Sequence, residues 1–244
     1  MLALAFAAPA GAALPPSDEF DGTTLTGWST MDGDVTSGTD TASLANRMLT
    51  ITSAQASWVR AERAFYLWKP VSGDFVVTTR IHVHGMATPT PTADWSLAGL
   101  LVRRAPAGAS RDENWLGWTT GGVAGTQVFE RKTTRHAVSI LNLLQAQTGW
   151  VELRIARIGP RFLLLHRYDG GAWSLDYAYW RPDLPTTLQA GIDAQSGWQD
   201  TKADLVADVD FVHFAPTGIP LKARARFVSG KTAPPAVLRY VTRA

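Results

Sequence analysis

The sequence predicts an all-β sandwich built from one domain. Between positions 18 and 214 the apolar residues come in short runs rich in Val, Ile, Thr, Phe and Trp, and Gly, Pro, Asp and Ser separate these runs. Such runs are typical of strands, and the separating residues are typical of turns. The runs recur at roughly ten-residue intervals, which favours a two-sheet sandwich over alternating strand and helix units.

Ten strands are predicted along the chain. Residues 151–158 alternate apolar and polar side chains, Gly159 and Pro160 form a turn, and 161–168 returns as the second strand of a hairpin. In 137–147 the apolar residues fall at roughly helical spacing, although a strand is also compatible with this segment. The predicted strands are 47–53, 58–62, 74–83, 96–104, 113–119, 126–132, 149–158, 161–168, 188–194 and 203–213.

Both ends of the chain differ from this middle part. Residues 1–16 are Ala-rich and apolar, with small residues at Ala10 and Ala12, which is typical of a secretory signal that lacks its basic start; a disordered Ala/Pro arm is the alternative. The run is shorter than the about 20 apolar residues that a membrane span needs. Residues 216–244 are basic and contain no acidic residue, which predicts an extension or linker. The folded domain is therefore predicted at 17–215, in a secreted protein.

Composition excludes several classes of function. With 23 basic and 21 acidic residues the formal net charge is only +2, so no bulk field attracts nucleic acid or anionic membrane. The chain has no Cys, which excludes disulfides, thiolate nucleophiles and sulfur-ligated zinc. It also lacks a phosphate-binding loop, a dinucleotide fingerprint and a serine nucleophile elbow.

Seven short motifs occur in a consistent order along the chain. They are DEFDG at 18–22 with Leu25 and Trp28, GDFVVTTR at 73–80, AGLLVR at 98–103, GWVELR at 149–154, YDGGAW at 168–173, AGIDAQSG at 190–197 and ADVDFVHF at 207–214. Together they resemble the concanavalin A-like lectin/glucanase superfamily. The greatest likeness is to its bacterial branch of secreted domains and β-xylosidase C-terminal domains.

This resemblance implies a two-sheet antiparallel jelly-roll sandwich. Its first strand, at 18–28, would lie beside the last strand, and its concave sheet would carry sugar, as it does in many members. Because members include lectins, hydrolases, lyases and inert modules, the fold does not decide the function.

Carboxylates are the first candidates for catalysis. A retaining glycosidase needs a nucleophile and an acid about 5 Å apart. The alternating Glu-x-Asp-x-x-Glu run of the superfamily's β-glucanases is absent from the sequence. Glu130 and Glu62, on different predicted strands, remain the candidates, while solvated or salt-bridged carboxylates are the alternative.

Arginine and tryptophan supply the candidate binding residues. Arg103 and Arg131 match Arg positions typical of the branch that the chain resembles, where a guanidinium can hold sugar hydroxyls; structural pairing with Glu130 or Glu152 is the alternative. The sequence has ten Trp, and Trp95, Trp115 and Trp118 are predicted at loop edges or beside Gly, where an indole can stack on a pyranose ring. Core packing is the alternative for each of them.

Two kinds of metal site are compatible with the sequence. His82 and His84 share one face of a predicted strand, which suits a transition metal, but the sequence indicates no third ligand. The resemblance implies a structural calcium near the first and last strands, with Asp21 and Asp208 or Asp210 as oxygen ligands. The alternative for Asp21 is a turn formed with Gly22.

We therefore predict a secreted carbohydrate-binding domain that recognises polysaccharide or glycan on its concave face. The predicted ligand-binding residues are Trp95, Arg103, Trp115, Trp118, Glu130 and Arg131. A glycoside hydrolase or polysaccharide lyase acting on the same face is the alternative, and a non-catalytic structural or adhesive module is the second alternative.

Overall fold

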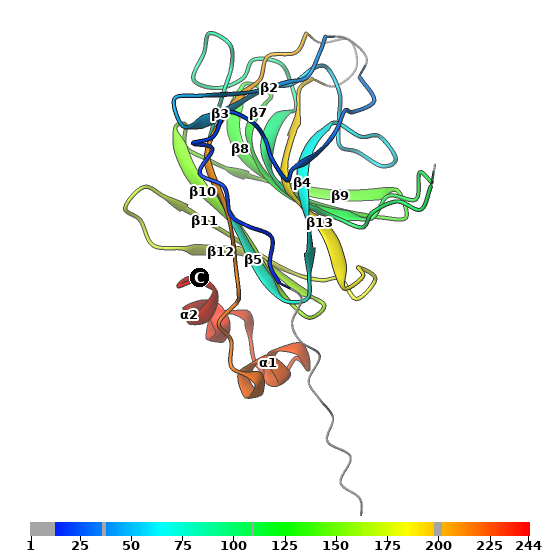
Figure 1. Cartoon of the computed structure of the whole chain (residues 1–244), viewed down its shortest axis with the longest axis vertical. Helices are drawn as coiled ribbons and strands as arrows, with labels where there is room; N and C mark the ends of the chain where they lie inside the picture. Colours follow the sequence, from blue (N-terminus) through cyan, green and yellow to red (C-terminus); the bar gives the residue numbers. More distant parts are fainter. Residues whose placement is uncertain (1–12, 36–37, 109, 198–201) are drawn as a thin grey trace, which may run out of the picture.

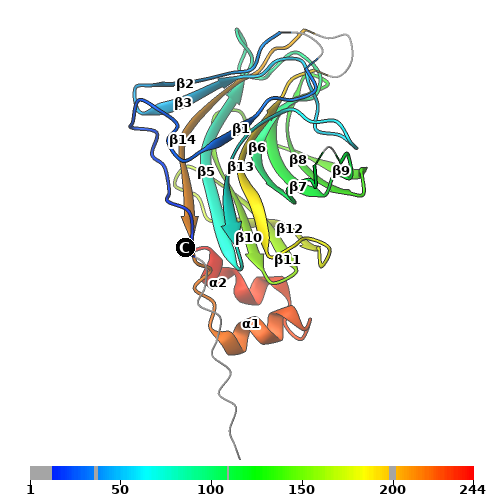
Figure 2. The same ribbon diagram turned by 45° about the vertical axis from the view of Figure 1, so that its right-hand side comes forward.

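The computed structural model describes residues 13–35, 38–108, 110–197 and 202–244. Two seven-stranded antiparallel sheets pack face to face, as Figure 1 and Figure 2 show. Sheet A has the order β12-β11-β10-β5-β14-β3-β2, and sheet B has the order β1-β4-β13-β6-β7-β8-β9. The prediction of an all-β sandwich is confirmed.

The strands and helices have the following bounds. Sheet A contains β2 (Thr41–Ala45), β3 (Met48–Thr52), β5 (Phe75–His84), β10 (Trp150–Ile158), β11 (Arg161–Tyr168), β12 (Ser174–Trp180) and β14 (Val206–Ala215). Sheet B contains β1 (Ser29–Met31), β4 (Phe65–Ser72), β6 (Ser96–Arg103), β7 (Trp115–Val123), β8 (Thr126–Arg135), β9 (Val138–Gln145) and β13 (Thr187–Gln195). The C-terminal helices are α1 (Leu221–Val228), η1 (Pro234–Val237) and α2 (Leu238–Val241).

The core fills the space between the two sheets. Alternate residues of each strand point inward, so Val151, Leu153 and Ile155 of β10 meet Leu100 and Trp118 of sheet B in one buried cluster. The hairpin predicted at 151–168 is present, with Ile158 paired to Arg161 across the turn. Alternation in the sequence therefore fixes which face of each strand is buried.

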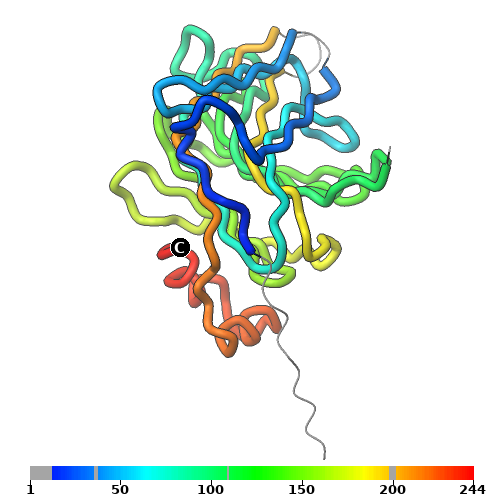
Figure 3. The backbone as a smooth tube through the Cα atoms, viewed as in Figure 1, coloured from blue at the N-terminus to red at the C-terminus, as the bar shows by residue number. Residues whose placement is uncertain are grey.

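The first described segment closes the sandwich beside the last strand. Asp18 pairs with Val212 of β14 through reciprocal backbone hydrogen bonds of 2.9 and 2.8 Å. The Asp18 carboxylate accepts hydrogen bonds from the Trp28 indole at 2.7 Å and the Phe20 amide at 2.9 Å. The tube in Figure 3 shows this dark blue segment running along the orange strand β14. The two hydrogen bonds that the Asp18 carboxylate accepts explain why an acidic residue stands at position 18.

Two segments differ from the sequence prediction. Residues 137–147 form strand β9 rather than a helix, because Val138–Gln145 pairs along β8. Residues 58–62 form a turn rather than a strand, closed by a hydrogen bond from the Glu62 amide to the Val59 carbonyl. Pairing with β8, which the local pattern does not contain, decided the structure of residues 138–145.

Residues 216–244, predicted as an extension or a linker, pack against the sandwich. Phe227, Val237 and Val241 are buried against the outer face of sheet A, where they meet Ala156 and Leu163. Figure 2 shows the helices at the lower end of sheet A. Arg154 of β10 donates hydrogen bonds to the carbonyls of Val241 and Ala244, which attaches the end of the chain to the sheet. The segment is therefore a folded extension of the sandwich.

No helix in the described part of the chain is long and apolar enough to cross a bilayer. The signal-like prediction for 1–16 falls almost wholly on residues 1–12, which lie outside the described residues.

Candidate functional site

Sheet B carries the face that the resemblance implies is concave. The first segment and the closing strand β14 belong to sheet A, so the opposite sheet is the one expected to bind sugar. In sheet B, Leu100, Trp118 and Phe129 point into the core. The residues between them in sequence therefore point to the outer face of sheet B.

A row of polar residues crosses this outer face. Strand pairing places Tyr66, Asp193, Gly99, Thr119 and Glu130 opposite one another in succession, on β4, β13, β6, β7 and β8. Because Gly99 has no side chain, no side chain of the row stands between those of Asp193 and Thr119. The row brings an Asp, a Thr and a Glu onto one face from three different strands.

The row contains buried charges that are incompletely paired. Glu130 lies 3.4 Å from the Lys132 ammonium, and both side chains are buried. Asp193 is 2% exposed, and its Oδ1 atom has no hydrogen-bond partner among the described residues. The same holds for the Thr119 hydroxyl. Buried polar atoms without partners are rare in folded proteins, and each requires an explanation.

Burial also changes the protonation of the row. It raises the pKa of Asp193 to about 8, and the charge of Glu130 adds to this effect. Burial likewise raises the pKa of Glu130, against the opposing attraction of Lys132. At neutral pH Asp193 is therefore mainly protonated, and its carboxyl group can donate a hydrogen bond as well as accept one.

Trp95 lies beside the Glu130–Lys132 pair. Its half-buried indole packs on a small apolar cluster formed by Leu97, Val123 and Val128. The Lys132 ammonium lies 5.9 Å from the centre of the Trp95 ring, within the range of a cation–π contact. Of the six predicted ligand-binding residues, Trp95 and Glu130 are thus brought together.

Arg103 and Trp115 occupy a different, structural cluster on the same face. Arg103 is 1% exposed and binds Glu113 through two hydrogen bonds of 2.9 and 2.7 Å. Trp115 is buried and packs edge to face against Trp58, with ring centres 5.8 Å apart. Trp115 borders a loop as the first residue of β7, but it is only 1% exposed, so its indole is packed as a core residue. Neither side chain is available to a ligand in this arrangement.

Trp118 and Arg131 point to the other side of sheet B. Trp118 is fully buried in the core, donates a hydrogen bond of 2.9 Å to the Leu165 carbonyl and stacks on Phe129. Trp118 lies beside Gly117, but its indole is therefore packed as a core residue. Arg131 pairs with Trp118 across β7 and β8, so it shares that face, and its guanidinium lies over the Tyr177 ring. Arg103 and Arg131 consequently do not face one ligand.

The remaining predicted residues lie apart from the row. Glu62 is an exposed turn residue. Asp210 is bound by Arg80 at 3.1 Å, and Asp208 accepts a hydrogen bond from Thr50 at 2.8 Å. Asp21 is exposed and belongs to no group of three potential ligands in the described part of the chain. Calcium binding by Asp21 with Asp208 or Asp210 therefore stays a prediction.

Sequence reasoning missed Asp193 as a site residue. Its strand reads TLQAGIDAQ, in which Gln189, Asp193 and Gln195 share one face while Leu188, Ala190 and Ile192 share the other. The polar alternation within an otherwise apolar strand was the available signal. The partners of Asp193 across the sheet come from distant parts of the chain, and no local pattern identifies them.

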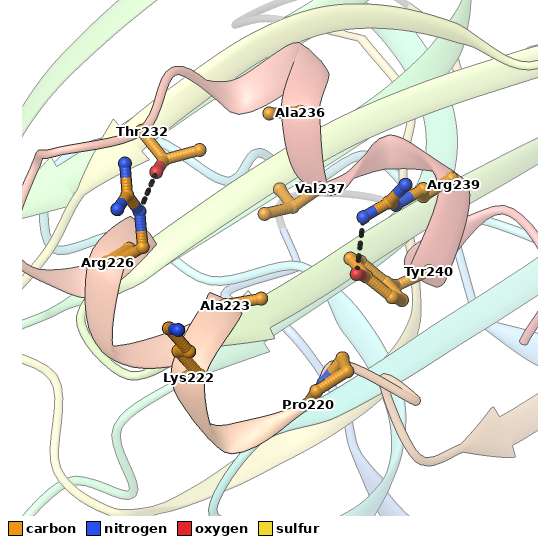
Figure 4. Close-up of a pocket in the computed structure, with 9 residues that line it drawn as sticks. All are labelled: Pro220, Lys222, Ala223, Arg226, Thr232, Ala236, Val237, Arg239 and Tyr240. Atoms are coloured by element: carbon orange, nitrogen blue, oxygen red, sulfur yellow. Dashed lines mark hydrogen bonds between the residues drawn. The ribbon is translucent and has the colours of Figure 1, made fainter.

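A separate hollow lies among the C-terminal helices. Its volume is about 480 Å³, and its polar lining is basic, with Lys222, Arg226 and Arg239. Figure 4 shows Arg226 bonded to Thr232 and Arg239 bonded to Tyr240. These side chains are directed toward neighbours on the same helical segment, and we assign the hollow to helix packing.

No protein-family model and no curated protein matches the chain. Similar solved structures include the GH43 BlXynB protein from Bacillus licheniformis, with a TM-score of 0.63 and 16% identity over 82% of this chain and 39% of that chain. Lectin I-B4 from Griffonia simplicifolia has a TM-score of 0.53 and 11% identity over 82% and 99%. A β-1,3-glucanase from Mycobacterium marinum has a TM-score of 0.51 and 13% identity over 83% and 99%.

These similarities show the fold. The neighbours are concanavalin A-like sandwiches, and they include a lectin, a glucanase and GH43 glycoside hydrolases. The chain spans about two fifths of the length of the GH43 proteins it matches. At these identities the likeness shows the fold and does not decide the function.

Proposed function

We propose that the chain is a secreted carbohydrate-binding domain that binds polysaccharide or glycan on the outer face of sheet B, beside Trp95. One observation carries the proposal: a half-buried indole lies next to the polar row in which Asp193 and Thr119 have unpaired oxygens. A pyranose ring stacks its apolar face on an indole, and its hydroxyl groups both donate and accept hydrogen bonds. A sugar bound beside Trp95 would supply hydrogen-bond partners for the unpaired oxygens of Asp193 and Thr119.

Burial decides how the ligand approaches. Asp193 and Glu130 are 2% and 3% exposed, so they form a polar floor rather than a first point of contact. The Trp95 ring is the more accessible group and supplies the initial stacking. A protonated Asp193 then offers a hydrogen-bond donor to a neutral sugar.

The rival function is a glycoside hydrolase that uses Asp193 and Glu130. In its favour, both carboxyl groups have raised pKa values, as a catalytic acid requires. Their strands are separated by β6 and β7, however, and three strand spacings amount to about 14 Å between the two backbones. Catalytic carboxyl groups lie about 5 to 9.5 Å apart. Side chains extend from these backbones, and the charge of Glu130 raises the pKa of Asp193, so the backbone spacing leaves both functions open and an assay has to decide between them.

A glycan array and a polysaccharide pull-down test the proposal. The wild-type chain is expected to be retained by at least one glycan, and Trp95→Ala is expected to weaken that binding about tenfold, or about 1.4 kcal/mol. The matched control is Trp180→Ala, which removes an indole that is 47% exposed on β12 of sheet A. Equal affinity of Trp95→Ala and wild type would contradict the proposal, and no retention at all would favour a structural or adhesive module.

A reducing-sugar assay on every retained glycan separates binding from hydrolysis. A binding domain releases no new reducing ends. A release that is lost in both Glu130→Gln and Asp193→Asn would instead establish the hydrolase function. The pull-down repeated in EDTA tests the calcium prediction, because a calcium-dependent site would lose retention.

A further inference from the structure

Three potential metal ligands meet on the outer face of sheet A. His82 and His84 are two residues apart on β5 and therefore share one face. Asp208 of the adjacent strand β14 pairs directly opposite His82. The donor atoms of the three side chains all lie within 4.8 Å of one another. The third ligand for the histidine pair thus comes from a strand more than a hundred residues later, which the sequence alone does not reveal.

His84 and Asp208 are each oriented by a hydrogen bond to a group outside the proposed site. The Nδ1 atom of His84 lies 2.7 Å from the Gly85 carbonyl, which it binds as a donor, so the Nε2 atom carries the free lone pair. The Thr50 hydroxyl donates to Asp208 Oδ1 at 2.8 Å and leaves Oδ2 for another partner. Such outer contacts orient metal ligands in known sites.

The distance between the two oriented atoms suits a small cation. His84 Nε2 and Asp208 Oδ2 are 3.3 Å apart. Two ligands at about 2.0 Å from a tetrahedral zinc ion would be separated by about 3.3 Å. The His82 ring lies 4.8 Å from the His84 ring, so a small side-chain rotation brings its nitrogen to the same centre. Little rearrangement is required to complete three ligands.

The donor set indicates the class of metal. Two imidazoles and one carboxylate suit zinc and the neighbouring divalent transition metals, whereas calcium and magnesium prefer oxygen ligands throughout. The side chains of His84 and Asp208 are 25% and 19% exposed. An ion held here is therefore open to solvent on one side, and water can occupy its remaining position.

We propose that His82, His84 and Asp208 bind one divalent transition metal ion of the zinc class, in a three-ligand site on the outer face of sheet A. The site is independent of the proposed glycan site, because the two lie on the outer faces of different sheets. It joins β5 to β14, and a bound ion would stabilise the folded chain by mass action.

Calorimetric titration with Zn²⁺ and the absorption spectrum of Co²⁺ test this site. The metal-free wild-type chain is expected to bind one equivalent of Zn²⁺, to melt at a higher temperature with Zn²⁺ and to give intense visible Co²⁺ bands. His82→Ala, His84→Ala and Asp208→Asn should each weaken Zn²⁺ binding by at least tenfold. Thr50→Val, which removes only the hydroxyl that orients Asp208, should weaken it by about tenfold.

His213→Ala is the matched control. His213 lies further along β14 and contacts Glu19 instead of the proposed ligands. It should leave Zn²⁺ affinity and the Co²⁺ spectrum unchanged. Melting curves without metal show that each variant folds, so a loss of binding in a folded variant supports the site. Absence of saturable Zn²⁺ binding, or equal binding by folded His82→Ala and wild type, would overturn the proposal.

Discussion

The outer faces of the two sheets both carry arginine–carboxylate pairs, but they hold them in different surroundings. On sheet A, Arg80 binds Asp169 and Asp210 with side chains that are 25%, 58% and 44% exposed. On sheet B, Arg103 binds Glu113 with both side chains 1% exposed. Water screens the first set and is excluded from the second. The same chemistry therefore contributes little to stability on one face and is indispensable on the other.

The contrast extends to unpaired groups. On sheet A the C-terminal helices cover part of the outer face and bury Phe227 and Val241, and the unpaired atoms among the described residues there are two donors, Arg161 Nε and Trp173 Nε1. On sheet B, buried Asp193 and Thr119 retain unpaired oxygens, and burial raises the pKa of Asp193 to about 8. A folded protein tolerates such atoms where a ligand or water completes them. The face with the less complete bonding is the better candidate for recognition.

The largest expected effect is on the buried pair. Arg103→Ala leaves Glu113 buried with one of its arginine partners missing, so the free energy of unfolding should fall by about 3 to 5 kcal/mol. Urea denaturation followed by fluorescence measures this change. Arg63 also binds Glu113, at 2.6 Å, and a loss below about 1 kcal/mol would mean that Arg63 alone neutralises the carboxylate.

A pH-dependent effect, smaller per pH unit, is expected from Asp193→Asn. Because the folded pKa of Asp193 is about 8, the folded state keeps a proton that the unfolded state loses near pH 4. Its contribution to stability is fully present below pH 4 and is lost as the pH rises toward 8, by about 1.4 kcal/mol per unit where Asp193 alone titrates. Asp193→Asn should flatten the plot of unfolding free energy against pH in this window.

Asp169→Asn is the control on the opposite face. The hydrogen bond from Arg80 lowers the pKa of Asp169, so its stabilising contribution is lost only when the pH falls through that lowered value. The slope between pH 5 and 8 should therefore be the same as in wild type. An unchanged slope in Asp193→Asn as well would show that Asp193 is ionised in the folded chain.

The smallest effect is expected at the exposed pair. Arg80→Ala removes two partly exposed ion pairs and the contact of its guanidinium with the Trp150 ring, 4.4 Å away. The expected loss in unfolding free energy is about 1 kcal/mol or less. It should decrease further in 1 M salt, whereas the loss in Arg103→Ala should persist. Equal losses at the two sites would refute the contrast between the faces.

Much of the fold could be predicted because strand alternation is a local property. The hairpin at 151–168 and the inward residues of β10 follow from the order of apolar and polar residues. The segment at 137–147 was ambiguous for the same reason, since its pattern suits a helix until β8 is available to pair with it. The C-terminal helices were missed because their apolar residues become a core only against sheet A.

The candidate site was predictable to a lesser extent. Trp95 and Glu130 do meet on one face through Lys132. The sequence does not show that Trp118 and Arg131 point away from the outer face. A shift of one residue in strand register moves a side chain from the core to the outer surface. The same limit applies to His82 and His84, whose partner Asp208 lies on another strand.

The sequence by itself determined the all-β class, the near-neutral charge, the absence of thiol chemistry and the alternation that buries one face of each strand. Only the tertiary structure decided which distant strands lie side by side. That choice placed Asp193 with Glu130 on one sheet and Asp208 with the histidines on the other. The physical reason is that side-chain direction is set by local backbone geometry, whereas strand order depends on the burial of the whole core.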